Sequence, residues 1–364
     1  MIRVLHLATM PLPMPLGSPV YIGGLVRALS RRGLKITLGC FKGNGPVQWE
    51  GVETIIPDIS LISGSGPHWA RPLQDFGLLK KIRRLDVEIV HAHHVESPWI
   101  ARMAFGRSMP VIHHLHTRLE QELPAWWGWG KWAGKAVDRM VPAISDANIA
   151  ISSASEAHFR RIRARRVSTI LPGIDPTDLE GAESERGRRS LALDGRHWLI
   201  YAGNTDPYQS LERLPSILQA VPEAGLIVLA TDEGRSLRDW VHHLPANRLR
   251  VRTRAIWPDV RDALAAADLA VLPREHCAGF PMKLLNQLAL GLPTVGLSAA
   301  CPDLPGTVRV PTIDGFAGAI RALLSDEERR TRLSREAREA MREHTWDARA
   351  AEVEALYREL LQGS

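Results

Sequence analysis

The sequence predicts an α/β protein built from two parallel-sheet domains. Three observations support this prediction: the chain has 364 residues, short apolar runs alternate with longer amphipathic stretches along it, and a segment rich in proline and glycine interrupts the alternation near the middle. A chain of this length exceeds one ordinary core and suits two domains of roughly 150–200 residues each. The alternation of short strands with longer helices is typical of parallel βα units.

The first half contains the candidate strands and helices of one domain. The opening run is apolar but holds Arg3 and His6 and is followed by prolines, so it predicts a buried strand and not a signal peptide. Helices are expected at Ser18–Arg32 and Leu73–Leu85. The strands are expected at Arg3–Ala8, Lys35–Cys40, Val87–His91, Pro110–Leu115 and Asn148–Ser152.

The second half repeats this pattern after a junction. Ser168–Pro176 carries two prolines and a glycine, and the polar run Glu180–Arg189 follows it, so we place the hinge between the domains there. The stretch from Leu333 to Leu361 is helix-rich and is broken near His344–Asp347, so we expect a final helix that packs back on the first domain. The strands are expected at Trp198–Ala202, Leu226–Ala230, Leu249–Thr253, Leu269–Leu272 and Thr294–Leu297.

Composition limits the class of function. Hydrophobic residues make up 45% of the chain and charged residues 24%, which is typical of a folded, soluble protein. The net charge of +6 and a pI of about 9.5 favour anionic ligands without choosing among nucleotides, nucleic acids and acidic lipids. No nucleic-acid recognition motif is present. Cys40, Cys277 and Cys301 are odd in number and far apart, so we expect no disulfide framework and a cytoplasmic location. No apolar run approaches the roughly 18 residues of a membrane-spanning helix.

The run Arg274–Gly291 predicts a loop that leads into a helix N-terminus. Gly279 permits close approach of the backbone, Pro281 suits the first helical position, and Met282–Leu290 is a helix-forming run that Gly291 stops. The free N–H groups of a first helical turn attract anions. The run is therefore a candidate phosphate site, although α/β proteins also use such loops as plain connections.

A second glycine turn is predicted in the same domain. Tyr201–Glu212 has the pattern of a strand, a turn at Gly203 and a helix. It is either a plain connection or a second loop that converges on the same ligand. The chain has no G-x-G-x-x-G fingerprint and no G-x-x-x-x-G-K-[ST] loop, which argues against a dehydrogenase and a P-loop NTPase.

Histidines gather at the ends of two neighbouring predicted strands. Imidazole is a common metal ligand, but the run lacks the His-Glu-x-x-His spacing and has no cysteine or carboxylate at ligand-like intervals. We therefore expect no metal, with some of these histidines buried and hydrogen-bonded and others lining a phosphate or sugar site. They are His91, His93, His94, His113, His114 and His116.

Four of the eleven tryptophans lie in one short stretch with two lysines and no acid. Tryptophan favours places that are half apolar and half wet. The stretch is either a surface for an acceptor or an anionic membrane or a core patch under a loop, and we favour the surface because lysines and glycines interleave the rings. The basic runs Lys80–Arg84 and Arg160–Arg166 fit the same surface. The residues of the stretch are Trp126, Trp127, Trp129, Trp132, Lys131 and Lys135.

Several segments together carry a family resemblance. They are, in order, Leu16–Ser18 with Leu25–Gly33, Asp86–His93, Pro110–Thr117, Asp146–Ser152, Leu171–Asp175, Tyr201–Leu211 and Gly279–Gly291. As an ordered set they resemble the family 4 glycosyltransferases of the GT-B fold, and the similarity covers nearly the whole chain. The resemblance implies two Rossmann-like domains that face each other across a cleft. Residues 1–170 would form the acceptor-side domain, 171–343 the nucleotide-sugar domain, and 344–364 a helix returning to the first domain.

The resemblance also implies a retaining transfer of a sugar from a nucleotide-sugar, without a metal or other cofactor. Helix N-termini and cationic side chains would stabilise the departing diphosphate. The catalytic roles fall to His116, near the reacting sugar, and to Arg274 and Lys283. The residues expected to bind the nucleotide-sugar are Gly17, Ser18, Gly203, Asn204, Gly279, Phe280, Pro281, Met282 and Asn286.

The chain departs from the family pattern at two places. The family's pair of glutamates falls on Ala278 and Asn286, of which only the asparagine keeps hydrogen-bonding groups. Gln209 and Ser210 stand where Lys-Gly is common. We expect a hexosyltransferase that acts on a glycan or lipid-linked acceptor, in cell-surface polysaccharide or glycolipid synthesis at the inner membrane surface. The alternative is a catalytically silent protein of the same fold that binds a nucleotide or a partner. A sugar-nucleotide epimerase is disfavoured because the second-domain glutamate is missing.

Overall fold

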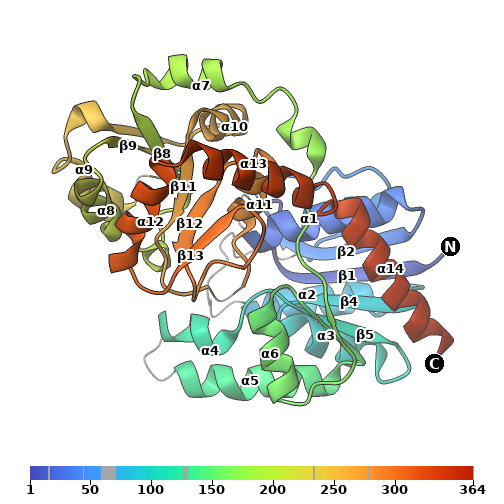
Figure 1. Ribbon diagram of the computed structural model, residues 1–364. Helices are drawn as coiled ribbons and strands as arrows, with labels where there is room; N and C mark the ends of the chain where they lie inside the picture. The colour runs from blue at the N-terminus through green and yellow to red at the C-terminus, as the bar shows by residue number, and fades with distance from the viewer. Residues whose placement is uncertain are drawn as a thin grey trace. The chain divides into compact units, whose positions relative to one another are not determined.

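The computed structural model describes residues 1–14, 17–43, 45–58, 71–125, 130–232, 234–277 and 279–363. It contains two parallel sheets, and the chain divides into two compact units (Figure 1). Unit 1 comprises Met1–Gly173, Ala278–Phe280 and His344–Ser364, and unit 2 comprises Ile174–Cys277 and Pro281–Glu343. The two parallel α/β sheets confirm the predicted fold class.

Unit 1 is built on a seven-stranded sheet of order β3-β2-β1-β4-β5-β6-β7, in which all neighbours are parallel. The strands are β1 (Arg3–Leu12), β2 (Lys35–Lys42), β3 (Val52–Ile55), β4 (Ile89–His93), β5 (Val111–Leu115), β6 (Ala147–Ala150) and β7 (Val167–Thr169). The helices are α1 (Gly17–Arg31), α2 (Arg71–Ile82), α3 (Glu96–Phe105), α4 (Leu119–Glu122), α5 (Gly130–Ile144), α6 (Ser153–Arg161) and α14 (Trp346–Gln362).

Strand ends differ from the prediction where polar side chains find partners. The third expected strand, Val87–His91, is shifted by two residues in the structure. The Glu88 carboxylate accepts the backbone N–H of Arg3 at 2.9 Å, outside the strand proper. At the other expected end, Ser152 does not continue β6 but caps α6, because its Oγ accepts the backbone N–H of Ser155 at 3.2 Å. The short strands β3 and β7 were not predicted.

Helix α14 is part of unit 1 although it comes last in the chain, and it packs on α1 (Figure 1). The predicted break before it is present, and Thr345 caps the helix by accepting the backbone N–H of Ala348 at 3.2 Å. Trp346 is 5% exposed. A Cβ atom on Gly24 of α1 would lie 2.2 Å from the Trp346 ring, so only glycine permits this approach.

Unit 2 is built on a six-stranded parallel sheet of order β10-β9-β8-β11-β12-β13. The strands are β8 (His197–Gly203), β9 (Ala224–Ala230), β10 (Leu249–Thr253), β11 (Leu269–Leu272), β12 (Thr294–Leu297) and β13 (Thr307–Val310). The helices are α7 (Ser184–Leu191), α8 (Leu214–Ala220), α9 (Arg235–Val241), α10 (Trp257–Ala266), α11 (Met282–Ala289), α12 (Asp314–Leu324) and α13 (Glu327–Met341).

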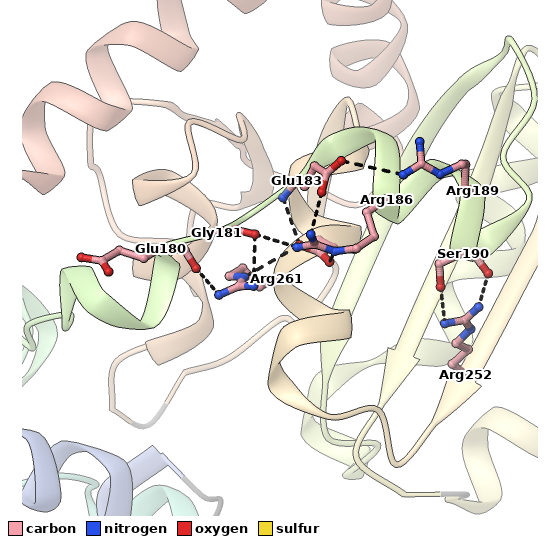
Figure 2. Close-up of polar contacts among 9 residues, drawn as sticks. Glu180, Gly181, Glu183, Arg186, Arg189, Ser190, Arg252 and Arg261 are labelled. Atoms are coloured by element: carbon pink, nitrogen blue, oxygen red, sulfur yellow. Dashed lines mark hydrogen bonds and ion pairs between the residues drawn. The ribbon is translucent and has the colours of Figure 1, made fainter.

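The polar run at the predicted hinge belongs to unit 2 and forms α7 (Figure 2). The Arg186 guanidinium lies 2.6 Å from the Glu183 carboxylate and donates to the Gly181 carbonyl at 2.6 Å. Arg261 donates to the carbonyls of Glu180 and Gly181. The Arg261 bonds join the residues before α7 to α10, so the polar character of the run reflects ion pairs and hydrogen bonds within the unit.

Two further features bear on the protein's surroundings. Among the described residues, no helix has both the length and the apolar character needed to cross a bilayer. Cys40, Cys277 and Cys301 form no disulfide bond, in agreement with the sequence analysis, and Cys40 and Cys301 are buried.

Candidate active site

The adjacent strands β1, β4 and β5 bring histidines together in unit 1. The register places His6 opposite His91 and His93 opposite His114. Strands β4 and β5 are buried along their whole length. Polar side chains in such strands must find hydrogen-bond partners within the protein, because burial without a partner is costly.

These histidines form a continuous run of hydrogen bonds that includes a tyrosine from α14. Nδ1 of His114 lies 2.7 Å from Nε2 of His91, and Nδ1 of His91 lies 2.6 Å from the hydroxyl of Tyr357. The same hydroxyl lies 3.1 Å from Nε2 of His6. The tyrosine of α14 therefore joins His91 of β4 to His6 of β1 through a single oxygen atom.

The run continues from His6 to the residue predicted to be catalytic. Nδ1 of His6 lies 3.0 Å from Nε2 of His93, and Nδ1 of His93 lies 2.9 Å from Nε2 of His116. We refer to the whole run as the histidine chain. Its members, in order, are His114, His91, Tyr357, His6, His93 and His116.

Burial keeps the imidazoles of the histidine chain neutral at physiological pH. Burial lowers the pKa of His6 to about 3. It also lowers the pKa of each of the other four well below the ordinary imidazole range, and neighbouring histidines lower these pKa values further. A neutral imidazole carries one N–H donor and one acceptor nitrogen, which is the pattern that a linear hydrogen-bonded chain needs.

Two of the six strand-end histidines, His94 and His113, do not belong to the histidine chain. Nδ1 of His113 lies 3.3 Å from Oδ1 of Asn148, and burial is the main cause that lowers the pKa of His113 to about 4. His94 follows β4 with a φ of 63°, and burial lowers its pKa to about 3. Six strand-end histidines were identified from the sequence, and the structure places them in a buried polar cluster.

The geometry of the cluster favours hydrogen bonding over metal binding. Ligand atoms of His91, His93 and His114 lie within 4.8 Å of one another. Their rings are nearly parallel, however, with interplanar angles of 15° to 25°. Imidazole lone pairs lie in the plane of the ring, so three such rings do not converge on one tetrahedral ion. Their nitrogens pair with one another instead, and the absence of a metal stays a prediction.

His116 ends the chain beside an aromatic ring and a glycine of the same unit. Its ring meets the edge of Tyr21 with the centroids 5.1 Å apart. A Cβ atom on Gly279, which groups with unit 1, would lie 2.3 Å from the His116 carbonyl oxygen. Glycine is therefore needed at position 279 for steric reasons.

Gly17 and Ser18 open helix α1 after the end of β1. Gly17 is exposed and Ser18 is half-buried. The first turn of α1 carries no acidic residue, so its free N–H groups and the helix dipole favour an anion there. The structure thus leaves both residues accessible for the phosphate contact that the sequence predicted.

In unit 2, the loops after β8 and β11 meet at Lys283. A Cβ atom on Gly203, whose φ is 153°, would lie 2.7 Å from the Lys283 Nζ atom. The Nζ atom donates to Oε1 of Gln209 at 2.9 Å and lies 3.9 Å from the centroid of the Tyr201 ring. The turn at Gly203 therefore contacts the first turn of α11, the helix that follows the second glycine loop in the sequence.

Gln209 extends this contact towards Asn204. Nε2 of Gln209 donates to Oδ1 of Asn204 at 2.6 Å, and Nδ2 of Asn204 donates to the Tyr208 hydroxyl at 2.8 Å. The family pattern has a lysine at position 209. Here the glutamine serves as an acceptor that orients the Lys283 ammonium group.

Arg274 supplies a second cation to the same site. It is 5% exposed, and its Nη2 atom donates to Sγ of Cys277 at 3.0 Å. Burial, and then the charge of Arg274, lowers the pKa of Lys283 well below its ordinary range. Neither cation makes an ion pair with a carboxylate among the described residues, and the neighbouring Glu275 pairs with Arg213 at 2.8 Å. An anion bound here would relieve the repulsion between two poorly solvated cations.

Helix α11 begins next to these cations. The sequence placed Pro281 at the first helical position, but α11 starts one residue later, at Met282, and Pro281 is the N-cap. The ψ of 83° at Pro281 lies outside the helical region, which explains the shift. Phe280, Met282 and Asn286 are partly buried. Ala278 lies outside the described residues.

A cavity of about 430 Å³ elsewhere in unit 2 is also lined by arginines. Arg252 donates to Oγ of Ser190 at 2.8 Å (Figure 2), and Arg186 donates to Oδ1 of Asp262 at 2.8 Å. Because these guanidinium groups already bond to protein oxygens, we do not assign this cavity as the anion site.

Part of the tryptophan-rich stretch lies on helix α5. Trp132 is 77% exposed, and the Lys135 Nζ atom lies 5.9 Å from its ring centroid. Lys131 is exposed beside it, and Met140, two turns further along, is 50% exposed. Trp126, Trp127 and Trp129 lie outside the described residues. The described part of the stretch is therefore a surface, as the sequence favoured.

Comparison with known protein families gives two matches along the chain. The model of Glycosyltransferase Family 4 matches residues 16–178, and the model of Glycosyl transferases group 1 matches residues 196–326. The chain is 27% identical to the D-inositol 3-phosphate glycosyltransferase of Xylanimonas cellulosilytica, over 98% of this chain and 96% of that protein. It is 23% identical to the enzyme of the same name from Segniliparus rotundus, over 100% of this chain and 90% of that protein.

Solved structures share the fold. Sucrose-phosphate synthase from Thermosynechococcus elongatus superposes with a TM-score of 0.85 at 18% identity, over 100% of both chains. HepE from Anabaena in complex with UDP-glucose superposes with a TM-score of 0.71 at 15% identity, over 98% of this chain and 100% of that chain. WaaG, a glycosyltransferase involved in lipopolysaccharide biosynthesis, gives a TM-score of 0.71 at 14% identity, over 96% and 98% of the two chains. At these identities, the likeness shows the fold alone.

Proposed function

Since this chain belongs to glycosyltransferase family 4 and is a transferase of the GT-B fold, we propose that it moves a hexose from a nucleoside diphosphate sugar to a hydroxyl group of its acceptor with retention of configuration. The same matches favour an enzyme over the catalytically silent alternative. The donor would bind unit 2, and the acceptor would bind mainly unit 1.

The pair of cations in unit 2 is the observation that carries the donor assignment. Arg274 and Lys283 are held near one another, are poorly solvated and lack a carboxylate partner among the described residues. A diphosphate supplies the missing negative charge, and the N–H groups of the first turn of α11 add further donors. Similar structures have been solved in complex with UDP, UDP-glucose or ADP, which supports a nucleotide-sugar as the ligand class.

The chemistry follows from these charges. The bond between the anomeric carbon and the diphosphate oxygen breaks, and its electron pair leaves with the diphosphate. Arg274 and Lys283 stabilise that developing charge, so no metal is required. The acceptor hydroxyl oxygen bonds to the same face of the carbon, and its proton passes to the departing phosphate oxygen. His116 hydrogen-bonds the transferred sugar, while Asn286 bonds the ribose hydroxyls in place of the family's glutamate.

The proposed acceptor is a glycan or a lipid-linked sugar presented at the inner membrane surface in cell-surface polysaccharide or glycolipid synthesis. The exposed face of α5 supports this location, because Trp132 and Met140 provide apolar contact and Lys131 and Lys135 provide charge. A second candidate acceptor is a small phosphorylated cyclitol, because the relatives from Xylanimonas cellulosilytica and Segniliparus rotundus are D-inositol 3-phosphate glycosyltransferases.

Ligand-observed NMR against UDP-, GDP-, ADP- and dTDP-sugars tests the donor assignment. We expect the nucleotide-sugars of one base to bind at submillimolar concentration. We expect the Lys283→Gln substitution to weaken that binding. If no member of the panel binds at millimolar concentration, the donor assignment is wrong. Transfer to lipid-linked sugars, oligosaccharides and inositol phosphate, followed by mass spectrometry with and without a chelator, then identifies the acceptor. Because the site has two cations and needs no metal, the chelator should leave the rate unchanged.

Liposome flotation tests the membrane proposal separately. The wild type should float with vesicles that contain anionic lipid and remain in solution with neutral ones. Trp132→Ala should reduce flotation while leaving donor binding intact. Flotation that is equal for both proteins would remove α5 from the membrane-binding surface.

A further inference from the structure

The histidine chain fixes the position of its hydrogen atoms by simple counting. Each of the five neutral imidazoles carries one N–H, and Tyr357 carries one O–H, so six hydrogens are available for five hydrogen bonds. Every bond needs one hydrogen, so one hydrogen is left outside the chain. An interior imidazole uses both nitrogens in bonds, so its hydrogen always lies within the chain.

The spare hydrogen therefore has three places. It sits on Nε2 of His114, on the hydroxyl of Tyr357 if that oxygen accepts from both sides, or on Nδ1 of His116. The first two places are unfavourable. Nε2 of His114 is fully buried and has no partner. The Tyr357 side chain is 0% exposed, and its hydroxyl already lies between the ring nitrogens of His91 and His6, which would both donate to it in this arrangement.

The third place avoids a buried donor without an acceptor. Orphaned buried N–H and O–H groups are rarer than under-satisfied acceptors, since the donor loses its only partner. With the spare hydrogen on His116, Nε2 of His114 becomes a bare acceptor. Among the described residues, no buried and unpartnered nitrogen belongs to His116, which is 2% exposed. All five hydrogen bonds then point in one direction, from His114 towards His116.

We propose that the histidine chain holds His116 as its Nδ1–H tautomer and that His93 is the positioning residue that does so, by donating its Nδ1–H to Nε2 of His116. The importance of this for transfer rests on the proposed function, in which His116 contacts the sugar. His116 then presents an N–H donor to an oxygen atom of the sugar. The Nδ1 atom of His116 then has no free lone pair, so it does not take up the proton of the acceptor substrate's hydroxyl group.

The tautomer can be measured directly. Protein labelled with ¹⁵N in histidine gives long-range ¹H–¹⁵N correlations that separate protonated from bare ring nitrogens, and the signals of His116 are assigned by their loss in His116→Gln. We expect a protonated Nδ1 and a bare Nε2. A protonated Nε2 with a bare Nδ1, or an imidazolium, overturns the proposal. The spectrum requires neither donor nor transfer, so a failed transfer assay would count against the proposed function alone.

Two substitutions that each break one link of the histidine chain distinguish a positioning role of His93 from a general loss of order in unit 1. His93→Phe removes the donor to Nε2 of His116, so the His116 signals should change to a mixture of tautomers. Tyr357→Phe divides the chain further away and leaves His6, His93 and His116 joined, so the His116 signals should persist while those of His91 and His114 become mixed. Unchanged His116 signals in His93→Phe, or equal disturbance of His116 in both variants, contradicts the assignment of His93.

Discussion

Replacing Tyr357 by Phe should destabilise unit 1 by a predictable amount. In the wild type, the hydrogens of the histidine chain can be arranged so that no fully buried N–H of its imidazoles lacks an acceptor. Without the hydroxyl, His114 and His91 form an isolated pair with two hydrogens and one bond between them. Both outer nitrogens of the pair are buried, so one N–H is left without an acceptor. An unsatisfied buried donor costs about 1–3 kcal/mol, which is the expected loss of unfolding free energy.

Thermal unfolding and hydrogen exchange measure this loss. For a unit of this size, each kcal/mol lowers the midpoint temperature by about 2–4 °C. Because the polypeptide has two units, hydrogen exchange of the α14 and β4 amides should be followed by mass spectrometry to confirm that the loss of unfolding free energy lies in unit 1. The expected result is faster exchange in both elements and unchanged exchange in β8 and β9.

Tyr21→Phe provides a matched control from the same unit. Tyr21 is 1% exposed, like Tyr357, but its hydroxyl makes one long hydrogen bond, 3.4 Å to the carbonyl of Ile170. Removing it leaves no N–H unpaired, so we expect a loss below about 1 kcal/mol. Equal losses for the two variants would refute the counting argument.

Three further predictions concern charge and sterics. Lys283→Gln removes a charge-assisted hydrogen bond worth about 1.5–3 kcal/mol, so donor affinity should fall by about 10- to 150-fold by calorimetry; an unchanged affinity would exclude Lys283 from the site. Gly203→Ala places a Cβ atom 2.7 Å from the Lys283 Nζ atom, so donor affinity should fall. Thermal unfolding of the variant should remain cooperative, and an affinity equal to that of the wild type would show that the Lys283 side chain can move aside. Burial, and then the charge of Glu96, raises the pKa of Asp75 to about 6. The native state therefore binds this proton more tightly than the unfolded chain does, and its contribution is lost as pH rises from about 4 to 6. Asp75→Asn should be more stable than the wild type at pH 7 by about 1–2 kcal/mol, after allowance for partial exposure, and in denaturant titrations the difference should vanish at about pH 3, below the unfolded pKa of 3.8.

The fold followed from the sequence because hydrophobic periodicity is local. The alternating strands and helices and the break near Thr345 were predicted from short windows, whereas the contact between the Gly203 turn and Lys283 was left as one of two alternatives. The errors lie where a polar residue behaves as an apolar one. Strand β4 was expected to end at His91, but it continues to His93, whose ring is hydrogen-bonded at both nitrogens.

The histidine chain could not be predicted in full. The strand-end histidines were identified, and their gathering follows from parallel strands that share one edge. Tyr357 could not be connected with them, since its bond to His6 spans 351 positions and no local pattern distinguishes it from other tyrosines in amphipathic helices. The assignment of Gln209 as the partner of Lys283 likewise required the structure, because the family pattern suggested only a missing cation.

The place of α14 in unit 1 has a consequence for biosynthesis. Unit 1 begins with the first strand of the chain, but its core is incomplete until the segment that carries Trp346 and Tyr357 has left the ribosome. All of unit 2 is translated in between. Strands β4 and β5, whose histidines are buried in the folded protein, therefore lack their contact with α14 during most of translation. Helix α14 leaves the ribosome only after the second sheet is able to form. The part of the protein that is made first is thus the last to be finished.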